Sequence, residues 1–163
     1  MWWSDTRSFA LACVAALLAG CGYHLQGAVT LPEGLRSVYV STGDELSPFA
    51  VELRSGIERT GASLARAAGD ADAVIRIRED RTGRRVLSVS ARNTPQEYEV
   101  YYSVEFSIDR GGREVVAAQQ LELTRYFSFD ESLLLAKERE EVLLREAMAR
   151  DLTDLVLRRL GSL

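Results

Sequence analysis

The feature that most restricts the fold is a stretch of thirteen residues, 97–109, in which apolar and polar side chains alternate almost without a break. The apolar positions are Tyr98, Val100, Tyr102, Val104, Phe106 and Ile108. A period of two predicts one long β-strand with a buried face and a face in water. Directly after it, Arg110-Gly111-Gly112-Arg113 is typical of a hairpin turn, and residues 115–127 return as the neighbouring strand. The chain therefore contains a long antiparallel hairpin whose apolar face must be covered.

Helices on both sides of this hairpin in the sequence can provide the cover. A first strand is expected at residues 36–41, and Ser47-Pro48 then supplies an N-cap and an N1 proline for a helix that ends near Gly61. A second helix is expected over about residues 133–160. Its apolar stripe consists of Leu144, Met148, Leu152, Leu155 and Val156.

Alternation also appears over residues 73–78 and again over 85–91, and Thr82-Gly83 is expected to form a turn between the two stretches. The element order is then β-α-β-β-β-α, give or take one strand break. The predicted fold is an α/β (α+β) sandwich, with two helices packed on one face of a mixed, roughly four-stranded sheet. The other face of the sheet is expected to be polar and open to water or to a partner.

Reactive side chains are scarce in this chain. Its 163 residues carry a net charge of −4 and include two cysteines, one histidine (His24) and one lysine (Lys137). The acidic balance argues against a nucleic-acid binder, and the scarcity of His and Cys argues against a metal site or a Cys/His nucleophile pair. No catalytic motif stands out. We expect a single domain that is not an enzyme and needs no cofactor.

The N-terminal segment indicates where the protein resides. An apolar run of eleven residues, 9–19, is too short to span a bilayer but suits a secretory signal. It ends in Leu18-Ala19-Gly20-Cys21, which looks like a bacterial lipobox. Residues 1–20 are then a lipoprotein signal peptide, and residues 21–163 form one periplasmic domain with a lipidated Cys21. The alternatives are a plain secretory signal or a buried apolar helix with an incidental cysteine.

Several short motifs stand out along the chain: Cys21-Gly22-Tyr23-His24-Leu25-Gln26-Gly27, Leu31-Pro32, Arg92-Asn93, Glu97-Tyr98, Arg125 with Phe127 and Phe129, and Leu135-Ala136-Lys137. Together they resemble the LptE family of lipopolysaccharide-assembly lipoproteins. The resemblance covers the whole chain after the signal and agrees with the predicted element order. It implies a lipid-anchored protein on the periplasmic side of the outer membrane. Such a protein forms a 1:1 complex with the β-barrel LptD, plugs the barrel and binds lipopolysaccharide without catalysis.

The resemblance also assigns two residues. Arg92 and Lys137 match basic positions through which members of this family bind lipopolysaccharide. Since the two are far apart in sequence, a joint site requires the loop before the long strand to approach the loop before the last helix. From the residues alone, Lys137 could equally be a helical ion-pair partner of Glu141.

Six arginines between positions 76 and 92 form a local basic run. Of these, Arg76, Arg78 and Arg85 are candidates for an accessory patch, because guanidinium groups bind phosphate well. A solvated strand edge, on which charges discourage pairing with other strands, explains the same run without a ligand.

Two alternatives to the family function remain open at this point. One is a generic scaffold lipoprotein for envelope assembly that binds no lipid, and the other is a small lipid-anchored periplasmic hydrolase. The hydrolase would need a nucleophile and a base in a recognisable pair, which the sequence does not show.

Overall fold

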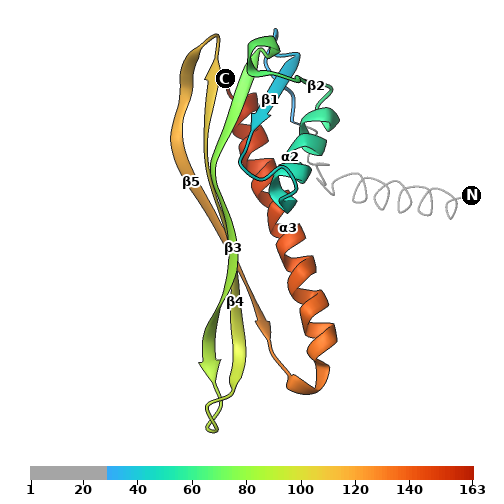
Figure 1. The fold of residues 1–163 in the computed structure, drawn as a ribbon, viewed down its shortest axis with the longest axis vertical. Coiled ribbons are helices and arrows are strands. Elements are labelled where there is room, and N and C mark those ends of the chain that lie inside the picture. Colours follow the sequence, from blue (N-terminus) through green and yellow to red (C-terminus); the bar gives the residue numbers. More distant parts are fainter. Residues whose placement is uncertain (1–28) are drawn as a thin grey trace, which may run out of the picture.

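A mixed five-stranded sheet runs through the computed structural model, which describes residues 29–163 (Figure 1). Two helices pack against it, as predicted. The elements in chain order are β1 (Ser37–Ser41), α2 (Pro48–Arg59), β2 (Ser63–Leu64), β3 (Ala73–Val89), β4 (Pro95–Arg110), β5 (Arg113–Ser128) and α3 (Leu134–Gly161), with short 3₁₀ turns at Ala68–Asp70 and Glu131–Leu133. The strand order is β2-β1-β3-β4-β5. The fifth strand, β2, has two residues, too few to produce a periodic signal in the sequence.

The sheet is wide at one end of the molecule and narrow at the other. Strand β1 lies parallel to β2 and β3, but it pairs only with Ala73–Arg76 of β3. Strands β3, β4 and β5 are antiparallel and continue well beyond that point as a three-stranded arm (Figure 1). Helix α3 lies along one face of this arm, and its first turns lie at the same end as the β3–β4 hairpin tip (Figure 1).

The predicted turn at Thr82-Gly83 is wrong, because β3 is one continuous strand of 17 residues. Gly83 pairs with Tyr101 on β4, and the tyrosine ring lies directly over it. A Cβ atom at position 83 would lie only 2.5 Å from the Tyr101 hydroxyl, so the glycine makes room for the ring. The Arg85 guanidinium covers the ring in turn, 4.7 Å from its centroid. Gly83, which the sequence pattern predicts to break the strand, thus lets the Tyr101 ring cover the sheet.

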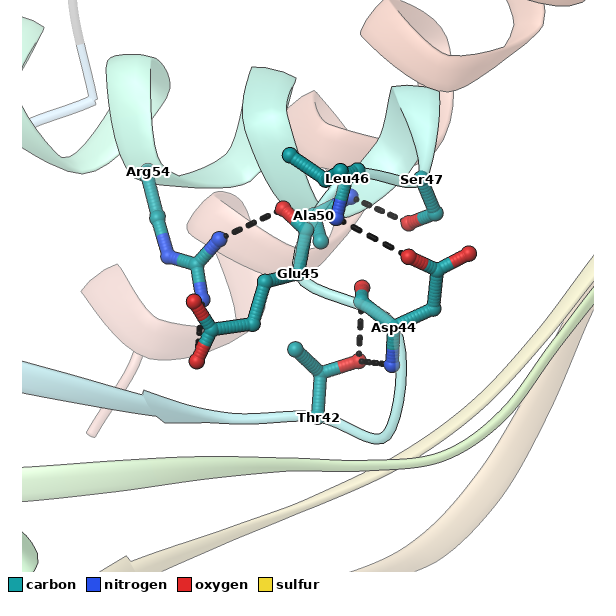
Figure 2. Close-up of polar contacts among 7 residues, drawn as sticks. All are labelled: Thr42, Asp44, Glu45, Leu46, Ser47, Ala50 and Arg54. Carbon is teal, nitrogen blue, oxygen red and sulfur yellow. Dashed lines mark hydrogen bonds and ion pairs between the residues drawn. The ribbon is translucent and has the colours of Figure 1, made fainter.

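The start of α2 is fixed as the sequence predicts. Ser47 is the N-cap, and its Oγ accepts a hydrogen bond from the Ala50 amide at 3.0 Å (Figure 2). The same Oγ donates to the Asp80 carboxylate at 2.5 Å, and the Phe49 amide donates to the Tyr102 hydroxyl at 3.2 Å. These bonds tie the helix N-terminus to β3 and β4. Burial, with the nearby charge of Asp80, raises the pKa of Tyr102 well above its ordinary value.

The hydrophobic core lies between the sheet and the two helices. The predicted apolar face of β4 is buried, and α3 buries Met148, Leu152, Val156 and Leu160 along its second half. Helices α2 and α3 approach closely at Gly56, where a Cβ atom would lie 2.8 Å from the Thr153 side chain. The first half of α3 buries little, and Leu135 and Leu143 remain exposed there. That half of the helix therefore depends on polar contacts to stay on the sheet.

Candidate functional site

Arg92 lies at the tip of the β3–β4 hairpin. Short bonds between Ser90 and Thr94 close the loop, with their hydroxyls 2.6 Å apart and the Ser90 amide 2.8 Å from the Thr94 carbonyl oxygen. Asn93 takes the left-handed conformation that the tight turn needs, at φ 60°. The Arg92 side chain is exposed, and among residues 29–163 no carboxylate pairs with it. A loop closed by hydrogen bonds thus presents one guanidinium to solvent.

Lys137 lies in the first turn of α3 and points toward the sheet. Its side chain is only 17% exposed, and Nζ is 2.8 Å from a Glu140 carboxylate oxygen and 3.5 Å from the Ser128 hydroxyl. The ion pair with Glu140, rather than the expected one with Glu141, occupies the ammonium group. An anionic ligand would therefore have to compete with Glu140 for this cation.

The fold brings Arg92 and Lys137 to the same end of the arm but not into contact. Glu97 pairs with Ser128, the residue beside Lys137, whereas Arg92 lies five positions before Glu97. At roughly 3.3 Å per residue, the tip extends more than about 10 Å beyond the lysine. A compact anion cannot reach both cations, whereas a long ligand with separated charges can.

Aromatic side chains occupy the helix-facing side of the arm near Lys137. The Tyr98 ring stacks on Phe127 with centroids 5.7 Å apart and meets Phe129 edge-on at 5.3 Å. The Arg84 guanidinium lies over the Tyr98 ring, 4.9 Å from its centroid. This cluster gives the narrow end of the molecule a rigid floor beneath the start of α3.

Glu141 holds the first half of α3 on the sheet. Its side chain is 10% exposed and accepts hydrogen bonds from Arg84 of β3, at 2.9 Å, and from Arg145 one turn further along the helix. The sequence pattern did not reveal this residue, because its main partner lies 57 positions away. We call Glu141 with Arg84 and Arg145 the Glu141 clamp. Because Glu141 follows Lys137 by one helical turn, the clamp also sets the position of the lysine.

Asp130 caps the turn that leads into α3. Its carboxylate accepts hydrogen bonds from the Ser132 hydroxyl at 2.7 Å and the Ser132 amide at 2.9 Å. These bonds, helped by the charge of Lys137, hold the pKa of Asp130 below its ordinary value. The carboxylate therefore stays ionised beside the lysine at neutral pH.

The arginines of the candidate accessory patch are paired with carboxylates on the face of the sheet that turns away from the helices. The pairs are Arg76 with Asp109 at 2.8 Å, Arg78 with Glu114 at 3.2 Å, and Arg85 with Glu99 at 2.9 Å and Glu122 at 3.2 Å. Each arginine is about half exposed, so these pairs contribute little to stability. They do neutralise the basic run locally, and a role for it in binding phosphate stays a prediction.

Cys21 and the motif at residues 21–27 lie outside the described residues. Across positions 29–163, no group of three His, Cys, Asp or Glu side chains is placed to hold a metal ion. Within the same range, no helix combines the length and the apolar character that crossing a bilayer requires.

Comparison with known proteins decides the family. A family model described as "LptE: Lipopolysaccharide-assembly" matches residues 35–160, which cover most of the chain. The chain belongs to the LptE family. This membership places it among non-enzymatic lipoproteins involved in lipopolysaccharide assembly, so the hydrolase alternative is wrong.

Individual relatives agree with the LptE assignment. The LPS-assembly lipoprotein LptE of Pectobacterium atrosepticum is 23% identical over 159 residues, covering 94% of this chain and 85% of its own. The solution structure of a lipoprotein B from Nitrosomonas europaea is similar, with a TM-score of 0.72 and 28% identity over 86% of this chain and 91% of that one. The rare lipoprotein B of Shewanella oneidensis has a TM-score of 0.68 and 28% identity, covering 77% and 94% of the two chains.

Proposed function

We propose that this protein is the lipid-anchored partner of the outer-membrane β-barrel LptD, with which it forms a 1:1 complex. In this proposal residues 1–20 are removed, Cys21 carries the acyl chains, and the domain faces the periplasm and plugs the barrel. The domain also binds lipopolysaccharide through Arg92 and Lys137. The observation that carries the proposal is the LptE match over residues 35–160, in a fold that brings both cations to one end of the arm.

The position of Val29 and Thr30, the first described residues after Cys21, supports a plugging role. Val29 and Thr30 lie against Gly161, at the C-terminal end of α3. Lys137 is in the first turn of α3 and Arg92 is in the β3–β4 connection, and Figure 1 shows these two segments at the other end of the helix. A helix of 28 residues is about 42 Å long. An anchor at Cys21, eight residues before Val29 in the sequence, would leave the cationic end free to extend away from the lipid attachment. An elongated domain held at one end suits insertion into a barrel lumen.

The two cations would bind a phosphorylated lipid in different ways. Arg92 is exposed and can grip a phosphate through two parallel N–H groups. Lys137 must first exchange Glu140 for the ligand, which makes its contribution depend on competition between two anions. The separation of the cations suits two phosphate groups of one large lipid headgroup better than a single phosphate.

Charge reversal of both residues tests the binding role. The double variant Arg92→Glu/Lys137→Glu should lose affinity for lipopolysaccharide by at least tenfold, because a charge-assisted hydrogen bond contributes about 1.5–3 kcal/mol. A matched control is Arg158→Glu/Arg159→Glu, which reverses two exposed arginines at the far end of α3. The circular dichroism spectrum should be unchanged in both variants.

The outcomes separate the proposal from its main competitor. Equal loss of affinity in both double variants would indicate non-specific electrostatic attraction. Unchanged binding by Arg92→Glu/Lys137→Glu would refute the assignment of Arg92 and Lys137 as lipopolysaccharide-binding residues. A wild-type protein that associates with the barrel but binds no lipopolysaccharide would instead indicate a scaffold lipoprotein without a lipid-binding role.

A further inference from the structure

The sheet face opposite the helices carries a second candidate site near the hairpin tip. An open hollow of about 420 Å³ lies there, lined by Leu87, Glu97, Tyr126 and Ser128 of this face and by Phe127, whose ring stacks on Tyr98 on the helix-facing side. All three strands of the arm contribute to it. Neither the family match nor the proposed roles of Arg92 and Lys137 account for this hollow.

A β-bulge in β3 shapes one wall of the hollow. Val86 pairs with Tyr98, but Ser88 pairs with Glu97. Over this step β3 therefore has one residue more than β4. As a result the consecutive residues Leu87 and Ser88 both lie on the side of Glu97, where strict alternation would have turned Ser88 away. Bulges that re-aim side chains occur preferentially next to functional sites.

Glu97 forms the polar floor of the hollow, and Leu87 and Tyr126 form its two apolar walls. Glu97 lies between β3 and β5, and Ser88 Oγ donates to its Oε2 at 2.7 Å. Within the described chain the other oxygen, Oε1, accepts no hydrogen bond. Tyr126 on β5 is 64% exposed and Leu87 on β3 is 51% exposed. Their strands lie two inter-strand spacings apart, roughly 10 Å, which leaves room for one six-membered ring between the two apolar walls.

The charge of this face favours a neutral ligand. Its arginines are already paired with carboxylates, and Glu97 adds negative charge with no basic partner among residues 29–163. The cation beside the hollow, Lys137, lies 3.5 Å from the Ser128 hydroxyl but is paired with Glu140. A phosphate would be repelled by Glu97, and an acyl chain would leave the Oε1 atom of Glu97 without a polar contact. A ligand with one apolar face and several hydroxyl groups satisfies both the walls and the floor.

We propose that this hollow binds a neutral hexose of the polysaccharide part of lipopolysaccharide. The C–H face of the sugar would stack on the Tyr126 ring, Leu87 would cover the opposite edge, and two neighbouring hydroxyls would donate to Glu97. The proposal rests on the proposed function, since lipopolysaccharide is the ligand in both. Arg92 follows Leu87 by five residues at the adjoining tip, so one molecule can place a phosphate on the tip and a sugar in the hollow.

Saturation-transfer NMR and calorimetry with two probes test the proposal. The probes are the fully deacylated core oligosaccharide of lipopolysaccharide and isolated lipid A, each added to the full chain in detergent. Tyr126→Ala and Glu97→Gln should each weaken oligosaccharide binding at least fivefold and leave lipid A binding unchanged. The control Tyr39→Ala removes a tyrosine of β1 that pairs with Val74, on the same sheet face at the wide end of the molecule.

Each result has a defined meaning. Oligosaccharide binding that depends on Tyr126 and Glu97 but not on Tyr39 supports the hollow. No oligosaccharide binding by the wild type, or equal binding by Tyr126→Ala, overturns it even when intact lipopolysaccharide still binds. A Tyr126→Ala variant that loses only lipid A also overturns it and assigns the hollow to acyl chains. Failure of the wild type to bind intact lipopolysaccharide would refute the proposed function itself.

Discussion

The clamp at Glu141 gives the sharpest prediction for stability. Replacing it as Glu141→Gln keeps the shape of the side chain and one acceptor oxygen but removes the negative charge from between Arg84 and Arg145. Hydrogen bonds to charged groups contribute about 1.5–3 kcal/mol each when buried. The two arginine side chains are 48% and 32% exposed, so water recovers a large part of this. We expect the free energy of unfolding to fall by about 2 kcal/mol.

Urea unfolding followed by circular dichroism at pH 7 measures this loss. The control is Glu140→Gln, since Glu140 is the neighbouring residue but is 45% exposed, and its pair with Lys137 should contribute less than about 1 kcal/mol. Hydrogen exchange adds a local readout, because amides of the first turns of α3 should lose protection in Glu141→Gln alone. Equal stability of the two variants would refute the idea that a buried carboxylate holds this half of the helix on the sheet.

Three further substitutions test the packing and the electrostatics. Gly56→Ala should lower the free energy of unfolding by about 1 kcal/mol in thermal melts, because overpacking against Thr153 outweighs the gain in helix propensity. Gly83→Ala should displace the Tyr101 ring, which near-ultraviolet circular dichroism detects, and should cost about 1 kcal/mol. Backbone amides at the start of β1 lower the pKa of Asp72 below its ordinary 3.8, so its contribution is present above about pH 4 and disappears as the pH falls through the lowered pKa. Asp72→Asn should therefore be less stable than the wild type at pH 6 but equally stable in strong acid, as urea titrations at both pH values can show.

Local patterns predicted those elements whose causes are local. The alternation over residues 97–109 became β4, the glycine pair at 111–112 adopts the positive φ angles of the hairpin turn (58° and 75°), and Ser47 caps α2. Long-range partners decided the rest. The dipeptide Thr82-Gly83 is typical of a turn when only its neighbours in sequence are considered. It lies within a strand because the Tyr101 ring, 18 positions beyond Gly83, covers the glycine.

The candidate site shows the same division between local and distant causes. The arginines of β3 look like a basic patch in the sequence, because the carboxylates that neutralise them lie on β4 and β5. The Glu141 clamp and the hollow beside Tyr126 depend on strand register and on a bulge. Neither leaves a periodic trace in the sequence. The resemblance to the LptE family supplied Arg92 and Lys137, and the fold adds that they lie at one end of the arm without touching.

Co-purification from the outer membrane tests the central claim most directly. The full chain, expressed with an affinity tag at its C-terminus and extracted in detergent, should elute with one large β-barrel protein at a ratio of one to one. Cys21→Ala should abolish lipid attachment, which mass spectrometry of the N-terminal peptide detects. Recovery of the protein alone from the outer membrane, or with partners in no fixed ratio, would contradict the account.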